Sequence, residues 1–340
     1  MSIVGALKLA QLWAAHAVAA SAASAPAVPA PLPTTLPAPD SPEPSAALQL
    51  FPLLIWTAFS LSLAAVFHVY RPRTIRGPAR LREDESVVPT AAVLALACFA
   101  FVAVPSLYVG MTMSPKVIAT TQPLPLTNRQ KIVMGALAPA GALATAAIGN
   151  LLIRPGARPR FGLLPENLLP GIATGILGIA IVFPLMMWVS SGTELVWRAI
   201  HYEHPMEHEF LRILGESHDR AVQALVVIAA SVIAPVAEEF LFRGHLQTII
   251  STGLGKAFSR ERFVSTEPGP SAAARWAAIF ITSLCFAGIH PFWMFPPIFF
   301  LSVGLGYVYE RTGNLYAAMS MHALFNTLSV LLYRYLVGPH

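Results

Sequence analysis

The chain has 340 residues, of which 55% are hydrophobic and only 11% are charged, and its mean hydropathy is +0.62. Soluble domains carry about 25% charged residues, so this composition excludes an ordinary soluble domain and predicts a protein of the lipid bilayer. The formal net charge of +5 does not indicate nucleic-acid binding, because the basic residues lie in short loops between apolar runs. Cys98 and Cys285 lie inside apolar runs and predict neither a disulfide framework nor a metal site.

The N-terminal region carries two different signals. Residues 1–25 have one lysine, Lys8, then an apolar stretch and a small-residue end. This pattern is typical of a secretory signal peptide, and it also fits a weak first helix. Residues 26–46 contain eight prolines, which favour extended polyproline conformations and cannot span a bilayer. We expect these residues to form a tether outside the membrane.

Eight apolar runs reach or approach the length of about 20 residues that a spanning helix needs. They are 48–69, 88–109, 132–153, 168–190, 222–250, 276–290, 297–309 and 315–337. The sixth and seventh runs are short and are separated by a link rich in proline and aromatic residues, 291–297. The sequence therefore predicts an all-α, polytopic membrane helix bundle with about eight transmembrane helices, of which the N-terminal ones lie within residues 47–160.

Lysine and arginine are distributed unevenly between the two sets of loops. The loops after the first, third, fifth and seventh runs hold 13 basic residues, whereas the opposite loops hold six. Because cytoplasmic loops carry the excess of basic residues, we expect the side with 13 to be cytoplasmic. The proline tether, the segment 192–220 and the C-terminus then face outward.

The fifth apolar run contains three ionisable residues, Glu238, Glu239 and Arg243. Each such residue at the centre of a spanning helix costs roughly 2.5–3.5 kcal/mol on insertion scales, which makes it a functional candidate. Glu239 and Arg243 are four residues apart with the acid first, the order that favours an ion pair on one helix face. Glu238 points about 100° away, toward the face of Phe242. Helix packing therefore explains the pair but not Glu238, whose apolar setting suits a general base.

Polar residues also stand in the sixth and eighth runs. His290 closes the sixth run, where a lone histidine is often an interfacial or packing residue. His322 and Asn326 of the eighth run are four residues apart and share a helix face, so they could simply hydrogen-bond to another helix. With a rise of about 1.5 Å per residue, these three residues and Glu238 lie between about 12 and 22 Å from the cytoplasmic face. This depth permits one shared site.

Three motifs together resemble the CPBP family, the CAAX-protease and bacteriocin-processing (Abi-like) group of intramembrane proteases, which includes the CAAX prenyl endopeptidases. The motifs are Glu-Glu-x-x-x-Arg at 238–243, Phe-x-x-x-His at 286–290 and His-x-x-x-Asn at 322–326. Residues 309–315 and 161–163 are also similar to family members. Since the resemblance covers roughly residues 160–337, we expect a protease domain over 161–340. Residues 1–130 show nothing specific to the family.

The resemblance implies an intramembrane endopeptidase that cleaves a peptide bond of a membrane-associated protein or peptide. Glu238 and His290 would activate a water molecule, and His322 and Asn326 would donate hydrogen bonds to the oxyanion. The residues that would support the site structurally are Glu239, Arg243 and Phe286. The implied location is a bacterial-type plasma membrane. The implied partners are the lipid bilayer and a peptide or membrane-protein substrate, without nucleic acid.

A zinc-dependent mechanism is the main chemical alternative. The family has also been described as metalloproteases, and Glu238, His290 and His322 would form a zinc set of two histidines and one carboxylate. We favour a mechanism without a cofactor, because the asparagine of the last motif is a poor zinc ligand and a natural oxyanion donor. The pattern His-x-x-Glu-His at 204–208 also matches a zinc-protease motif. Pro205 and an outward loop of about 30 residues favour a solvated surface segment there instead.

Two functions of other classes compete with a protease. A non-catalytic membrane scaffold or chaperone of the same fold would keep the motifs for helix packing alone. A transporter would use the intramembrane charges as an ion path, but no duplicated or inverted halves are evident. The complete set of catalytic residue types favours the protease over the scaffold.

Overall fold

Apolar helices make up the described part of the chain. The computed structural model describes residues 54–65, 87–114, 117–118, 124–154, 159, 161–205, 208–259 and 272–336. Within these residues there is no strand, six helices are long and apolar enough to cross a membrane, and two shorter apolar helices accompany them. The prediction of an all-α, polytopic helix bundle is confirmed. The possible signal peptide 1–25 and the tether 26–46 lie outside the described residues.

The helices follow the eight predicted apolar runs. The separate helices are α3 (Val87–Thr112), α5 (Asn128–Leu152), η1 (Pro165–Asn167), α6 (Leu168–Ala199), α7 (Glu209–Glu216), α11 (Ala272–Gly288), η4 (Phe292–Met294), α12 (Phe295–Thr312) and α13 (Leu315–Leu336). The fifth run is one continuous helix made of α8 (Arg220–Ile228), η2 (Ala229–Ile233), α9 (Ala234–Glu239), η3 (Phe240–Gln247) and α10 (Thr248–Ser259). The seventh run, expected to be short, is long enough to span because its helix extends beyond 297–309 at both ends, over Phe292–Thr312. The two shorter helices are α11 and Leu54–Ala65.

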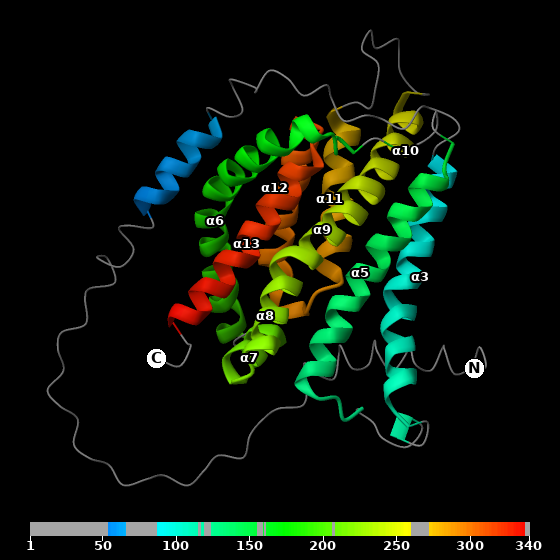
Figure 1. Ribbon diagram of the computed structural model, residues 1–340. Helices are drawn as coiled ribbons and strands as arrows, with labels where there is room; N and C mark the ends of the chain where they lie inside the picture. Colours follow the sequence, from blue (N-terminus) through cyan, green and yellow to red (C-terminus); the bar gives the residue numbers. More distant parts are fainter. Residues whose placement is uncertain are drawn as a thin grey trace, which may run out of the picture.

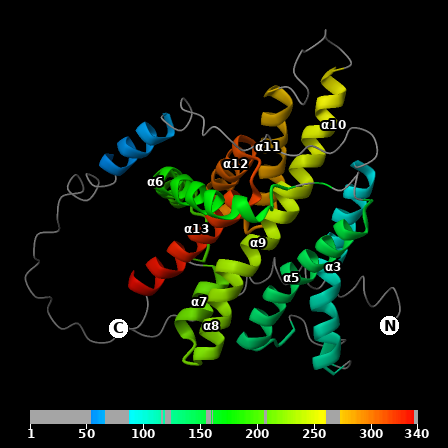
Figure 2. The same cartoon turned by 45° about the horizontal axis from the view of Figure 1, so that its top comes forward.

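The continuous helix from α8 to α10 lies at the centre of the bundle. Figure 1 shows the pair α3 and α5 on one side of it, and α5 contacts α9 while α3 contacts η3. On the other side α13 packs against α6, α9 and α12, and α12 packs against α11. The turned view in Figure 2 keeps the central helix between these two groups. The ionisable residues of the fifth run are therefore carried into the middle of the bundle.

Small residues on α6 allow α13 to approach it closely. A Cβ atom at Gly175 would collide with the side chain of Ser320, and one at Gly171 would lie 2.6 Å from the Cβ atom of Tyr316. Small residues four positions apart are common where membrane helices touch. This contact holds α13, which carries His322, firmly against the rest of the bundle.

The segment 192–220 is shorter as a loop than the sequence predicts. Helix α6 continues to Ala199, and α7 forms a second helix within the segment, so the expectation of a loop of about 30 residues is wrong. The buried side of α7, including Ile213, packs against Ile132 of α5 and Val330 of α13. Helix α6 continues past its apolar run, and the contact with the bundle stabilises α7, so less of the segment is irregular backbone. Helix α7 thus packs against the bundle, while residues around His201 stay exposed.

Candidate active site

Two π-helical stretches interrupt the central helix at the candidate site. They are η2 and η3, and the six residues of α9 between them include Glu238 and Glu239. Such wide turns are rare and frequently occur at functional sites. Pro235 stands at the start of α9 and has no N–H to donate to the preceding turn. Because the wide turns change the helical period, the directions of polar side chains before and after α9 do not follow from residue spacing alone.

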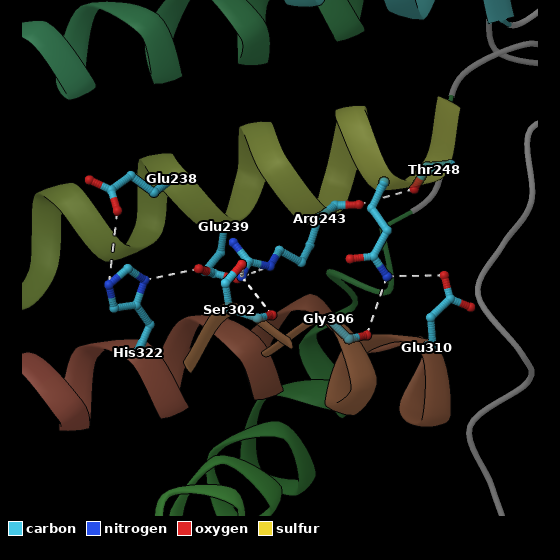
Figure 3. A network of polar contacts seen from close by, with 9 residues as sticks. Glu238, Glu239, Arg243, Thr248, Ser302, Gly306, Glu310 and His322 are labelled. Atoms are coloured by element: carbon cyan, nitrogen blue, oxygen red, sulfur yellow. Dashed lines mark hydrogen bonds and ion pairs between the residues drawn. The ribbon is translucent and has the colours of Figure 1, made fainter. Parts of the chain in front are cut away.

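Glu239 and Arg243 form a fully buried ion pair. The Nε atom of Arg243 lies 3.1 Å from Oε2 of Glu239, and both side chains are 0% exposed. The Nη2 atom of Arg243 also donates to the hydroxyl and carbonyl oxygens of Ser302 on α12, at 2.8 and 3.1 Å. Figure 3 shows the guanidinium between Glu239 and Ser302. Buried ion pairs need further hydrogen bonds to offset the loss of hydration, and Ser302 supplies two of them, both at Nη2 of Arg243.

His322 of α13 contacts both glutamates of α9. Its Nδ1 atom donates to Oε1 of Glu239 at 2.9 Å, and its Nε2 atom faces Oε2 of Glu238 at 3.9 Å (Figure 3). Since a carboxylate can only accept, the bond to Glu239 places a proton on Nδ1 and fixes the ring orientation. Nε2 is thereby turned toward Glu238. Glu239 thus links the buried arginine to the histidine.

The two neighbouring glutamates have different environments. The side chain of Glu239 is 0% exposed and contacts both Arg243 and His322, whereas that of Glu238 is 20% exposed and its contact with His322 is longer than a hydrogen bond. Glu238 can therefore be reached from outside the packed core, while Glu239 cannot. The sequence pattern predicts this division, and the geometry gives it a physical basis in accessibility.

Phe286 connects His290 to the rest of the cluster. Its ring lies 4.9 Å from the His290 ring and 5.7 Å from the His322 ring, and the guanidinium carbon of Arg243 is 4.7 Å from its centroid. The Nδ1 atom of His290 donates to the carbonyl oxygen of Phe286 at 2.7 Å. This bond leaves the lone pair of the neutral ring on Nε2, where the ring can accept a proton. The half-buried His290 therefore stands beside the cluster with an acceptor nitrogen.

Asn326 lies one helical turn beyond His322 and bonds to the first π-helical stretch. Its Nδ2 atom donates to the carbonyl oxygen of Ala230 at 2.7 Å. An amide nitrogen has two hydrogens, so this bond orients the group and leaves a second donor. The structure thus brings Glu238, Glu239 and His322 into direct contact or close approach, and links His290 to them through Phe286. Asn326 lies one turn along α13 from His322, and its bond is to η2.

Polar contacts continue along η3 toward α10. The Nε2 atom of Gln247 donates to the carbonyl oxygen of Gly306 at 3.2 Å and to Oε1 of Glu310 at 3.1 Å (Figure 3). The Nε2 atom of His245 lies 3.1 Å from the amide nitrogen of Asn150 on α5. These contacts attach η3 to α12 on one side and to α5 on the other. The turn that carries the buried arginine is therefore held from both sides.

Sequence reasoning misses Ser302. A single serine in an apolar helix commonly bonds to a carbonyl of its own helix, so its identity alone gives no signal. A weak signal does exist, because Ser302 and Gly306 are small residues four positions apart on α12. Both contact the polar side chains of η3, at Arg243 and Gln247. Such spacing marks a close helix contact, although it does not name the partner.

The alternative zinc set is not assembled as a metal site. Among the described residues, no group of three or more His, Cys, Asp or Glu side chains is arranged so that it could hold a metal ion. His322 directs Nδ1 to Glu239, and His290 directs Nδ1 to a backbone carbonyl. Zinc-binding histidines make Nδ1 bonds of this kind, so these two bonds do not exclude zinc. The three side chains do not form a close group in the described residues, and no step below passes through a metal.

The second zinc motif is divided between two structural roles. His204 stacks on Trp293 at 5.0 Å and contacts Oε2 of Glu194 at 3.1 Å. His208 accepts a hydrogen bond from the backbone N–H of Phe210 and caps α7. Each histidine thus holds part of the segment 192–220 in place. Glu207 lies outside the described residues.

The comparison with protein families agrees with these motifs. Residues 220–328 match the family described as type II CAAX prenyl endopeptidase, Rce1-like. The matched segment includes all four proposed catalytic residues, Glu238, His290, His322 and Asn326. The resemblance to CPBP intramembrane proteases is thereby confirmed over this segment, and the family is in general one of CAAX-type intramembrane proteases. No curated protein and no solved structure matches the chain.

Proposed function

We propose that this protein is an intramembrane endopeptidase that hydrolyses a peptide bond of a membrane-associated protein or peptide. The single observation that carries this proposal is the contrast between adjacent acids. Glu239 is fully buried and neutralised by Arg243, while Glu238 is accessible and faces His322. A purely structural role explains the first acid and leaves the second, which is costly in a membrane, without a purpose.

Water activation is assigned to Glu238 and His290. The carboxylate of Glu238 accepts a proton from water as the oxygen attacks the peptide carbonyl, and the acceptor nitrogen of His290 orients or shares that proton. The proton then passes to the leaving amine, so one water is consumed and two peptide ends are formed.

Stabilisation of the oxyanion is assigned to His322 and Asn326. The carboxylate of Glu239 holds Nδ1 of His322, so that Nε2 faces the proposed site and donates to the oxyanion when it carries a hydrogen. The second amide hydrogen of Asn326 is the other donor. Preorganised donors of this kind usually supply the largest single part of catalysis. Ala230 and Glu239 do the orienting, through the bonds described above.

The proposed setting is a bacterial-type plasma membrane, with the basic loops cytoplasmic. The substrate enters from the bilayer or its surface, and the partners are therefore the lipid bilayer and a peptide or membrane protein. No nucleic acid is involved. The competing function is a scaffold or chaperone of the same fold, in which the same contacts serve packing only.

A comparison of two isosteric variants tests the proposal. Cleavage products of membrane proteins would be compared across the proteome in cells that contain the wild-type protein, Glu238→Gln or Glu239→Gln. We expect Glu238→Gln to abolish the products while membrane expression stays normal. Glu239→Gln should mainly lower the yield of folded protein, because it leaves Arg243 buried without its partner, a loss of about 3–5 kcal/mol. Products that persist in Glu238→Gln, with equal expression defects in both variants, would support the scaffold.

A further inference from the structure

An apolar cavity lies on the face of α12 that points away from the candidate active site. Its volume is about 520 Å³, and its walls include Leu177 of α6, Val303 of α12 and Ala64 of the helix Leu54–Ala65. Ser302 contacts the buried arginine, whereas its neighbour Val303 lines the cavity. Helix α12 therefore separates the two spaces.

The cavity extends along the bundle over the depth of one membrane leaflet. On α6 its lining runs from Thr174 to Val182, and these eight residue steps correspond to about 12 Å. On α12 it runs from Val308, close to the helix end, inward to Phe300. Half of a hydrocarbon core of about 30 Å is about 15 Å. An acyl chain that follows the membrane normal from the nearer surface would therefore fill the cavity from end to end.

Aromatic and basic side chains mark the outer rim of the cavity. Trp276 of α11 lines it, is 44% exposed and stacks on Tyr307 at 5.7 Å between ring centroids. The guanidinium carbon of Arg311 lies 5.9 Å from the centroid of the Tyr307 ring. Tryptophan and tyrosine are enriched at the level of lipid headgroups. Arg311, one residue before the end of α12, is thus held at headgroup level above an acyl-sized cavity.

We propose that this cavity binds one anionic glycerophospholipid of the bilayer, with an acyl chain between α6 and α12 and its phosphate at Arg311. A guanidinium offers five N–H donors in a planar fork that matches a phosphate. Arg311 can therefore bind a lipid phosphate in addition to its contacts within the protein. Basic sites between membrane helices on the cytoplasmic side bind anionic headgroups. A zwitterionic headgroup would bring its own cation close to the arginine, so the site favours a lipid with net negative charge.

The lipid tail of a substrate is a less suitable occupant of this cavity. The peptide bond of a substrate must reach Glu238, which lies with the central helix on the other side of α12. A tail held between α6 and α12 would place α12 between itself and that residue. The site is therefore assigned to a resident lipid, and its occupancy does not depend on the proposed protease activity.

Thermal unfolding of the purified full-length protein in detergent tests the assignment. We expect dioleoylphosphatidylglycerol to raise the unfolding midpoint by roughly 5 °C at a concentration one hundred times its Kd, and dioleoylphosphatidylcholine to raise it much less. Arg311→Gln should lose most of the shift because the phosphate contact is removed. Val303→Phe should lose it because the ring occupies the acyl space. Arg334→Gln, an exposed arginine near the opposite end of α13, should keep the full shift.

Lipid retention and further controls distinguish a bound lipid from lipid that only surrounds the protein. Native mass spectrometry should find one phosphatidylglycerol retained per wild-type chain and none on Arg311→Gln. Equal shifts with both lipids, or unchanged shifts in both Arg311→Gln and Val303→Phe, would mean that lipid only surrounds the protein, and would overturn the site. Inorganic phosphate alone should not raise the unfolding midpoint. If it raised the midpoint as much as phosphatidylglycerol does, the claim that an acyl chain occupies the cavity would be refuted. If Val303→Phe fails to fold, Ala64→Phe fills the cavity from the opposite wall and makes the same prediction.

Discussion

At the residue scale, the site depends on a chain of contacts that runs across three helices. Ser302 on α12 binds Arg243, Arg243 pairs with Glu239, and Glu239 holds His322 on α13. Every group in this chain is buried, so each contact acts at low dielectric and each missing partner would be expensive. These contacts fix the His322 ring, and the groups that fix it stay buried. Only Glu238, at its edge, remains accessible.

The contribution of Ser302 can be measured by removing its hydroxyl. In Ser302→Ala, Nη2 of Arg243 loses a bond of 2.8 Å and keeps its bond to the backbone carbonyl of residue 302, so Glu239 and His322 are held less firmly. A hydrogen bond to a charged group contributes about 1.5–3 kcal/mol, and we expect kcat to fall by about tenfold with KM little changed. Ser302→Thr keeps the hydroxyl and should recover most of the rate. Ser329→Ala, whose hydroxyl bonds only within α13, is the control. A wild-type kcat in Ser302→Ala would show that Ser302 does not help to hold His322 in place.

The role of Asn326 separates oxyanion stabilisation from metal catalysis. Asn326→Ala should lower the cleavage rate by about 10²–10³, which is the usual effect of losing one oxyanion donor. Chelators should leave the wild-type rate nearly unchanged, since the three zinc-type residues are not arranged as a metal site. Elemental analysis of purified protein checks the second part. About one zinc per chain, lost together with activity in His322→Ala, would contradict the mechanism without metal.

At the element scale, local spacing predicts some contacts and cannot predict others. The pair of Glu239 and Arg243 follows from a separation of four residues on one helix. The partner of Asn326 does not follow from spacing, because it is a backbone carbonyl in a π-helical stretch that no hydrophobic pattern reveals. The extension of α6 to Ala199 is likewise hidden, since its last turns leave the apolar run. Helix existence and helix-internal pairs were thus predictable, whereas contacts between helices were not.

The N-cap of α7 predicts a dependence of stability on pH. Nδ1 of His208 accepts from the N–H of Phe210 at 3.2 Å, and a protonated ring would have no acceptor. Burial lowers the pKa of His208 below its ordinary value of 6.5, and Glu209 opposes part of that shift. Lys131 and Arg212 both pair with Glu209, and the titratable ring of His290 also interacts with His208. Because the unfolded chain binds the proton more readily, the stability from this cap is present above about pH 6.5 and is lost as the pH falls.

Thermal unfolding at pH 7.5 and pH 5.5 checks this expectation. The midpoint of the wild-type protein should fall by about 2–4 °C more than that of His208→Asn, whose side chain caps the helix at either pH. His218→Asn, at an exposed position near the start of α8, should behave like the wild type. An equally large fall in His208→Asn would show that the cap does not respond to pH in this range.

At the scale of the whole molecule, the central helix joins two helix groups and fixes which loops share an end. Helices α5, α10 and α12 finish at the end where α6, α11 and α13 begin, as Figure 1 shows. The alternation of the predicted spans is therefore preserved. Composition and run lengths suffice for this arrangement, because in a bilayer every spanning segment must satisfy its own backbone hydrogen bonds as a helix. The side of the membrane on which each end lies stays a prediction from the basic residues.

Cysteine labelling in intact cells tests that orientation. In a background with Cys98 and Cys285 replaced by alanine, a cysteine at Arg154 should react only after the membrane is made permeable. A cysteine at His201 should react with an impermeant reagent from outside. Both positions are exposed, so a lack of reaction cannot come from burial. The reverse pattern of labelling would invert the assigned topology.

The length of the central helix has a consequence for the choice of membrane. Its span from Arg220 to Gly255 has 36 residues, which corresponds to about 54 Å, against a hydrocarbon core of about 30 Å. Such a helix tilts or carries its ends into the headgroup layers, and each ångström of hydrophobic mismatch costs a fraction of a kcal/mol. Since both helix groups contact this element, a change in tilt would move α5 and α13 relative to each other. Bilayer thickness thereby becomes a variable that acts on the spacing of Glu238 and His322, and cleavage rates in vesicles of matched headgroup but different acyl length would report it.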